Sequence, residues 1–211
     1  MIDIIGKNAS IETYPKSFFS GRTTIGLNHA AYIYQTELAF SCYPFLISDL
    51  INLHHFSAAR VVGITFNPPN KCYPVTELHK PNFVPGLGEY VGYDRTKWLE
   101  PQDIDGHLKE AVDGKLGFGY KARDTCLHLA IFWALSSGHR EVNLFGCNHT
   151  KDSIKGFEPD DPGVDFVAAG KNRVKVTREL VITAPRHGVK INWWKNYDEY
   201  LKGVLYYGDC D

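Results

Sequence analysis

The sequence predicts an α/β protein with a mainly parallel sheet and helices on both faces. Two observations carry this prediction. Short runs of apolar and β-branched residues alternate with segments that contain helix-capping and helix-ending residues. The opening run at residues 2–5 is largely apolar, as expected of a buried strand. Alternation of strands with helices builds parallel sheets whose two faces are both covered by helices.

The first third of the chain supplies four of the expected strands. We expect them at residues 2–5, 22–27, 38–42 and 60–66. A turn at residues 6–10 follows the first strand, and Ser10 is expected to cap a short helix that Pro15 limits. A helical turn is expected at residues 30–34, and a helix from Pro44 to about His54.

Residues 67–120 differ in character from the rest of the chain. They hold six prolines together with many glycines and aromatic residues, and few periodic runs are visible. Long irregular segments of compact domains are usually functional. We therefore expect a Pro/Gly-rich insertion or lid with one or two short strands, one of them at residues 89–93. The whole chain, residues 1–211, is then one Rossmann-like domain that carries this insertion.

Regular structure is expected again from Arg123 onward, in the segment RDTCLHLAIFWALSSGHREVNLFGCN. Asp124 or Thr125 is expected to cap a helix that is apolar nearly all round, and is therefore buried, and that ends at Gly138. A strand at residues 141–145 then leads into a turn at Gly146. The remaining elements expected are a helix at residues 171–186, a strand at 189–193 and a short helix at 196–201.

Composition excludes several classes of function. The formal net charge is −1, so no basic field indicates a nucleic-acid partner. No apolar stretch is long enough for a membrane span, and Asp3 stands where a signal peptide would be positively charged. The five cysteines are odd in number and widely spaced, which argues against a disulfide framework or a Cys-rich zinc site. We expect a cytoplasmic location.

The turns that follow the strands are the candidate site. In parallel sheets, ligands bind beyond the carboxyl ends of the strands. The turns at residues 6–10, 28–29, 41–43 and 146–149 should therefore meet at one edge of the sheet.

Gly6, Lys7, Asn8 and Ser10 are candidates for phosphate binding in the first of these turns. Gly and Asn tolerate the backbone conformations that point N–H groups at an anion, and Lys7 adds a positive charge. The alternative is that Gly and Asn only make a tight strand–helix turn. Arg123 and Thr125 precede the buried helix, and an Arg at this position can bind phosphate or carboxylate through two hydrogen bonds. The simpler roles are a surface salt bridge for Arg123 and an N-cap for Thr125.

Histidine and acidic residues supply the remaining candidates. His149 follows Gly146 and Asn148 at a strand end, and it is either a general base or a structural histidine. Asp160, Asp161 and Asp165 lack the spacing of a calcium loop, so a solvated acidic loop is the simpler interpretation. We expect no resident metal site.

These segments resemble the bacterial sialyltransferases of glycosyltransferase family 42 and the related pterin-pyrophosphokinase-like proteins. The residues that carry the resemblance are the turns GKNAS, GLNHA and FSCYP and, most clearly, the segment 123–148. There Arg123, Thr125, Gly138, Glu141 and Gly146 match the family. The resemblance implies a nucleotide pocket lined by Gly6, Asn8, Asn28, Arg123, Thr125 and Gly146, and we add Asn148 from its place in the Gly146 turn.

The chain departs from this family at the catalytic positions. The family's general-base His falls on Ala169, and residues 150–165 contain no Tyr to steady the leaving phosphate. His149 or His29 is then the substitute base. Three hypotheses follow: a transferase that uses a nucleotide or nucleotide-sugar donor, an ATP- and Mg²⁺-dependent pyrophosphokinase-like enzyme, and a nucleotide-binding module without catalysis.

Overall fold

The structure is a computed structural model that describes residues 1–41, 60–66, 88–93, 101–114, 126–149, 154 and 166–208. Its centre is a seven-stranded, wholly parallel sheet with the strand order β5-β4-β3-β2-β1-β6-β7. The strands are β1 (Ile2–Ile5), β2 (Thr24–Leu27), β3 (Leu38–Ser41), β4 (Arg60–Phe66), β5 (Gly88–Tyr93), β6 (Glu141–Phe145) and β7 (Lys190–Trp194). The α/β prediction is confirmed.

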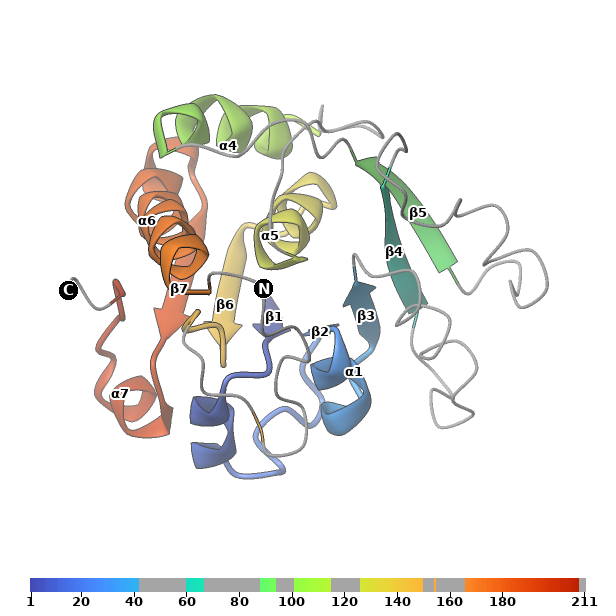
Figure 1. The fold of residues 1–211 in the computed structure, drawn as a ribbon, viewed down its shortest axis with the longest axis vertical. Coiled ribbons are helices and arrows are strands. Elements are labelled where there is room, and N and C mark those ends of the chain that lie inside the picture. Colours follow the sequence, from blue (N-terminus) through green and yellow to red (C-terminus); the bar gives the residue numbers. More distant parts are fainter. Residues whose placement is uncertain are drawn as a thin grey trace.

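Helices cover both faces of this sheet (Figure 1). The α-helices are α1 (His29–Tyr34), α4 (Ile104–Val112), α5 (Cys126–Ser136), α6 (Phe166–Thr183) and α7 (Tyr197–Lys202). The 3-10 helices are η1 (Ala9–Thr13), η2 (Pro101–Asp103) and η3 (Ala184–His187). One core joins α4, α5 and α6 to Ile2 and Ile4 of β1. A second core, on the opposite face, joins η1 and α1 to Ile5 and Phe145.

The order of the strands creates a switch point between β1 and β6. From β1 the chain adds β2, β3, β4 and β5 on one side, and then returns to place β6 and β7 on the other side of β1. The covering helices change face at the same place, because η1 and α1 lie on one face and α5 and α6 on the other. Ligands of open parallel sheets bind at such a reversal, beyond the carboxyl ends of the strands.

Helix α5 is buried on nearly every side, as its composition predicts. Nine of its eleven residues are buried, among them the polar His128. The helix ends at Gly138, whose φ of 92° lies in the left-handed region that a glycine adopts at little cost. A helix of this kind fills the space between the sheet and α4, so its position in the fold is fixed by packing.

Several boundaries differ from the sequence-based expectations. Asn8, not Ser10, caps η1, since its side chain accepts a hydrogen bond from the Ser10 N–H. Strand β2 begins at Thr24, because Arg22 turns to pair with Asp3. Helix α6 begins at Phe166, and its α-helical part stops at Thr183, where Pro185 converts the last turn to 3-10 geometry.

Helix α4 was not expected within residues 67–120. Ile104, Leu108 and Ala111 are wholly buried in the core with α5 and α6, so this part of the segment belongs to the main core. The strand expected at residues 89–93 is confirmed as β5. The helix expected from Pro44 to about His54 lies outside the described residues, and so does most of the expected insertion.

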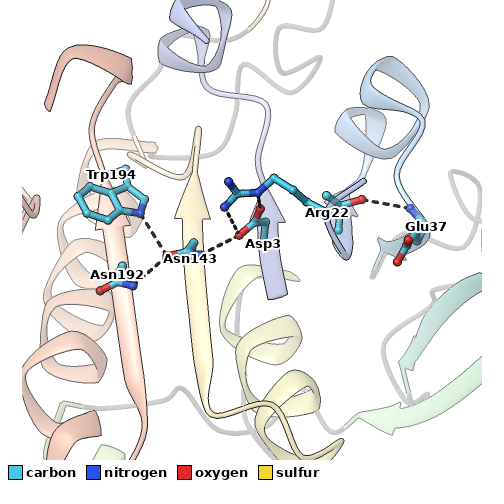
Figure 2. A network of polar contacts seen from close by, with 7 residues as sticks. Asp3, Arg22, Glu37, Asn143, Asn192 and Trp194 are labelled. Atoms are coloured by element: carbon cyan, nitrogen blue, oxygen red, sulfur yellow. Dashed lines mark hydrogen bonds and ion pairs between the residues drawn. The ribbon is translucent and has the colours of Figure 1, made fainter. Parts of the chain in front are cut away.

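A chain of polar contacts crosses the middle of the sheet, from Asp3 of β1 to Trp194 at the end of β7 (Figure 2). Asp3 accepts hydrogen bonds from the guanidinium of Arg22 and from Nδ2 of Asn143 at 2.8 Å. Oδ1 of Asn143 accepts in turn from Asn192 at 2.8 Å and from Trp194 at 3.3 Å. The bond to Asp3 raises the pKa of Arg22, so the guanidinium stays charged.

Within the described residues, no helix combines the length and the apolar character that crossing a bilayer requires.

Candidate functional site

The candidate site lies at the switch point, where the turn after β1 meets the turn after β6. Ile5 pairs with Phe145 in the sheet register, which places Gly6 beside Gly146. The Gly6 N–H donates to the carbonyl of Phe145 at 2.8 Å, and the Asn8 N–H donates to the carbonyl of Gly146 at 3.0 Å. The turns at residues 6–10 and 146–149 therefore form one backbone-bonded unit, as their positions predicted.

The two glycines permit this close approach. A Cβ on Gly6 would lie 2.2 Å from the carbonyl oxygen of Gly146, which is far inside van der Waals contact. Gly146 has a φ of 62°, and a Cβ there would lie 2.9 Å from the carbonyl oxygen of Gly6. The need for glycine at both positions is thus explained by backbone packing between the turns.

The first turn differs from the expected phosphate cradle in its backbone. Asn8 has an extended conformation, with φ −65° and ψ 141°, and does not use its tolerance of positive φ. The N–H groups of Gly6, Asn8 and Ser10 are all bonded within the unit, the last of them to Oδ1 of Asn8 at 3.0 Å. Lys7 is half-buried, and its carbonyl accepts from the Ile154 N–H at 2.9 Å. These amides hold the turns together.

Asn148 joins the two turns to a third segment. Its Nδ2 donates to Oγ of Ser10 at 3.0 Å and to the carbonyl of Lys195, which follows β7, at 3.2 Å. It also lies 3.5 Å from Oδ1 of Asn8. The side chain is buried, and its Oδ1 has no hydrogen-bond partner among the described residues. A buried acceptor without a partner is costly and indicates a ligand or water contact.

Asn28 holds the most unusual backbone conformation at this edge. Its φ of 52° and ψ of −131° lie in a region that is almost restricted to glycine, and such residues cluster at functional sites. Its N–H donates to the carbonyl of Phe40 in β3 at 2.9 Å. Its Oδ1 accepts from the thiol of Cys126, the first residue of α5, at 3.6 Å. Asn28 thus links the ends of β2 and β3 to the start of α5.

The remaining candidates divide into described and undescribed residues. His29 is the partly buried first residue of α1 and follows Asn28 directly. Arg123 and Thr125 lie outside the described residues, but Cys126, which follows Thr125, contacts Asn28. Asp160, Asp161 and Asp165 also lie outside them. In the part of the chain that the structure describes, no three His, Cys, Asp or Glu side chains group as a metal site would require.

His149 turns away from Asn148, toward the face of α5 and α6. Its Nε2 lies 2.9 Å from Oγ1 of Thr177, and its ring packs against those of His128 and Trp193 at centroid distances of 5.8 and 6.1 Å. Burial lowers the pKa of His149 well below its usual value, and the nearby His128 and Arg173 lower that pKa further. The ring is therefore neutral at pH 7.

Cys147 lies between Gly146 and Asn148, and its thiol is not a candidate reactive group. Burial raises the pKa of its thiol to about 12, although hydrogen bonding with the backbone of Gly6 and Phe145 opposes this change. The thiol is protonated at pH 7, and we assign it a packing role.

Sequence reasoning missed the residues that come from far along the chain. Thr177 in α6 and His128 in α5 contact each other at 2.8 Å, and both are wholly buried. His128 lies in an apolar run without a polar neighbour in sequence. A wholly buried His needs a hydrogen-bond partner, so its place in that run was the one available indication.

Fold and site together define the class as a Rossmann-like α/β protein whose candidate site occupies the switch point of a parallel sheet. Comparisons with protein families and with curated proteins gave no match. The fold is similar to that of the sialyltransferase CstII from Campylobacter jejuni, solved in complex with the substrate analogue CMP-3FNeuAc. The TM-score is 0.51 at 12% identity, over 91% of this chain and 79% of that chain. At this identity the likeness concerns the fold.

Proposed function

We propose that this protein is a transferase that binds a nucleotide or nucleotide-sugar donor at the switch point between β1 and β6. The observation that carries the proposal is that Asn28, bonded to the start of α5, and Asn148, bonded to Ser10, both follow strands at the carboxyl edge of one parallel sheet. The CMP-sugar analogue held by the structurally similar sialyltransferase supports a donor of this class. A polar edge with a strained Asn and a buried, unpartnered amide oxygen fits a ligand rich in hydrogen-bonding groups.

In this proposal, different polar groups at the edge bind different parts of the donor. Lys7, Arg123 and the hydroxyls of Ser10 and Thr125 bind the donor phosphate, since cations and hydroxyl donors complement its charge. Asn28 and Asn148 bind the sugar or the base through their amide groups, and Asn148 does so by accepting a hydrogen bond at Oδ1. Gly6, Asn8 and Gly146 keep the two turns in register, which holds Ser10 and Asn148 in place.

The proposed chemistry is transfer to a hydroxyl acceptor. The acceptor oxygen attacks the anomeric carbon of the donor, the bond to the phosphate oxygen breaks, and the nucleotide leaves with the electron pair. The acceptor's proton passes to His149, which is neutral at pH 7. His29 is the alternative proton acceptor, from its position beside Asn28.

Binding is tested by thermal shift and calorimetry with CMP, a CMP-sugar, UDP-sugars and ATP, each with and without Mg²⁺. A ligand present at a hundred times its Kd adds about 2.7 kcal/mol to the free energy of unfolding. We expect a nucleotide or nucleotide-sugar to raise the Tm without Mg²⁺. Absence of binding at millimolar concentration overturns the proposal, and binding of ATP only with Mg²⁺ favours the pyrophosphokinase-like alternative.

The role of Asn28 is tested with Asn28→Gly. Glycine adopts the same backbone conformation without strain, so the variant removes the amide and preserves the turn. We expect donor affinity to fall about tenfold or more, the effect of losing one hydrogen bond to a charged or strongly polar group.

Gln35→Gly is the matched control for this experiment. Gln35, with a φ of 46°, is an exposed residue in the left-handed region at the other end of α1. The control relieves comparable strain without touching the site, and its donor affinity should stay unchanged. Equal affinity of the two variants would remove Asn28 from the binding site.

A further inference from the structure

Thr177 lies at the centre of a buried cluster from which the proposed function uses only His149. Three polar atoms surround its Oγ1: Nε2 of His128 at 2.8 Å, Nε2 of His149 at 2.9 Å and the carbonyl oxygen of Arg173 at 2.9 Å. The cluster joins α5, α6 and the turn after β6. Thr177 and His128 are wholly buried, so the contacts persist without competition from bulk water.

The number of hydrogens determines how these contacts are made. A threonine hydroxyl has one hydrogen and two lone pairs, and a carbonyl oxygen accepts only. The contact with Arg173 therefore uses the hydroxyl hydrogen. The two lone pairs that remain accept one hydrogen from each histidine, so both rings carry a hydrogen on Nε2.

We propose that Thr177 and His128 are positioning residues that hold His149 in its Nε2–H form and leave its Nδ1 as the proton acceptor. The proposal rests on the proposed function for the use of that acceptor. The general arrangement, in which a third group fixes the tautomer and direction of a basic histidine, is common to many hydrolases and transferases.

The backbone and the surrounding charges support this arrangement. His149 has a φ of 56°, and the preceding Asn148 is anchored to Ser10 and to the carbonyl of Lys195, so the ring's direction is fixed from both sides. Nδ1 of His149 has no hydrogen bond within the described part of the chain. The charged or titratable groups facing His149 there are His128 from α5 and Arg173 from α6, while β7 contributes the uncharged Trp193. Both facing groups disfavour a charged ring.

The proton balance of the step is simple. The O–H bond of the acceptor hydroxyl breaks and an N–H bond forms at Nδ1, while the hydrogen on Nε2 stays bonded to Thr177. The resulting imidazolium returns its proton to solvent after the product leaves. No oxidant or further reactant is needed.

The tautomer is measured directly in the full-length protein by NMR. Two-bond ¹H–¹⁵N correlation spectra of protein labelled with ¹⁵N-histidine distinguish Nε2–H from Nδ1–H rings, and the His149→Gln variant assigns the peaks. We expect His149 to be an Nε2–H ring at pH 7. An Nδ1–H ring overturns the inference, whether or not the protein binds nucleotides, and no Thr177 variant is needed for this result.

Thr177→Val and Thr177→Ser separate positioning from packing. Valine keeps the shape and removes the hydroxyl, whereas serine keeps the hydroxyl. We expect Thr177→Val to give a mixed or changed tautomer at His149 and to displace the pH profile of donor turnover, with donor Kd unchanged, while Thr177→Ser restores both. An unaltered His149 spectrum in Thr177→Val overturns the inference. If the wild-type protein binds no donor, the proposed function is overturned instead.

Discussion

The two polar regions of the sheet differ in how fully their buried atoms are paired. In the network across the middle of the sheet, Asp3 is bonded to Arg22 and Asn143, and Asn143 to Asn192 and Trp194 (Figure 2). No buried side-chain nitrogen or oxygen of this network lacks a partner within the described residues.

At the carboxyl edge, some buried polar atoms of the described residues have no hydrogen-bond partner. Five buried polar atoms lack a partner in the described part of the chain, and three of these belong to Asn148, Arg173 and Trp193, around His149. An unpaired buried polar group costs about 1–3 kcal/mol. Among the described residues, the buried polar atoms of the Asp3 network are thus paired, whereas the surroundings of His149 hold three that are not.

The largest effect is expected from His149→Gln, on turnover. Glutamine keeps a hydrogen-bonding group near Thr177 and lacks a basic nitrogen, so the rate of donor turnover should fall about 10²–10⁴-fold. The free energy of unfolding should stay within about 1 kcal/mol of the wild type. Steady-state kinetics and urea unfolding measure the two quantities. Full turnover in this variant would leave His29 as the base.

Asp3→Asn should have the opposite outcome. It leaves Arg22 beside a neutral partner and weakens the bond to Asn143, so we expect a loss of about 2–3 kcal/mol in the free energy of unfolding. Donor affinity of the folded variant should be unchanged. Urea unfolding and calorimetry below the transition test this, and a change in donor Kd of tenfold would break the division between the two regions.

Gly6→Ala tests whether residues at the carboxyl edge also contribute to the free energy of unfolding. The added methyl would meet the carbonyl of Gly146 at 2.2 Å and force the two turns apart. We expect about 1–3 kcal/mol of destabilisation from overpacking, together with weaker donor binding because Ser10 and Asn148 separate. Urea unfolding and calorimetry measure both effects.

Gly106→Ala is the control for this experiment. Gly106 is an exposed residue of α4, and an added methyl group there would have no neighbouring atom within 4 Å. Alanine favours the helix over glycine, so this variant should be as stable as the wild type or slightly more so. Its donor affinity should be unchanged. If Gly6→Ala were as stable as Gly106→Ala, the close approach of the two turns would not be needed for the stability of the fold.

The smallest effect is a dependence of stability on pH. The pKa of His149 is lowered in the folded state, so the unfolded chain binds the proton more readily. Stability should therefore be full above the unfolded pKa of about 6.5 and fall as the pH drops below it, by up to about 1.4 kcal/mol per pH unit. His139, whose pKa is also lowered by burial, acts in the same direction. Urea unfolding from pH 5 to 8 should show a shallower slope for His149→Gln.

Much of the fold could be predicted because its central elements have strong local patterns. Strands β1 and β6 are short, largely apolar runs that are each followed by a glycine, and α5 is a largely apolar helix with Gly138 shortly after its end. Helix α4 was missed because its three buried positions lie in a short run behind a proline-rich stretch. The cap of η1 was misplaced because Asn8 and Ser10 are both good caps, and only the contact with the β6 turn selects Asn8.

The site was predictable as a place and less so as a set of contacts. The carboxyl ends of parallel strands had to share an edge, so Gly6, Asn28 and Gly146 were identified from order alone. The bonding of the two turns to each other has no pattern in the sequence, because it depends on sheet register. Thr177 lies 28 residues from His149 and 49 from His128, and no local feature marks the three as neighbours.

The placement of β1 has a consequence for how the protein is made. Strand β1 pairs with β2, which is close to it in the sequence, but its other neighbour, β6, is separated from it by 140 residues, as Asp3 and Asn143 show. Such distant pairings carry a large loop-closure cost and form late. A nascent chain that stops before β6 would keep one edge of β1 open and its Gly6 turn without a partner, so the candidate site forms only after β6 has been synthesised.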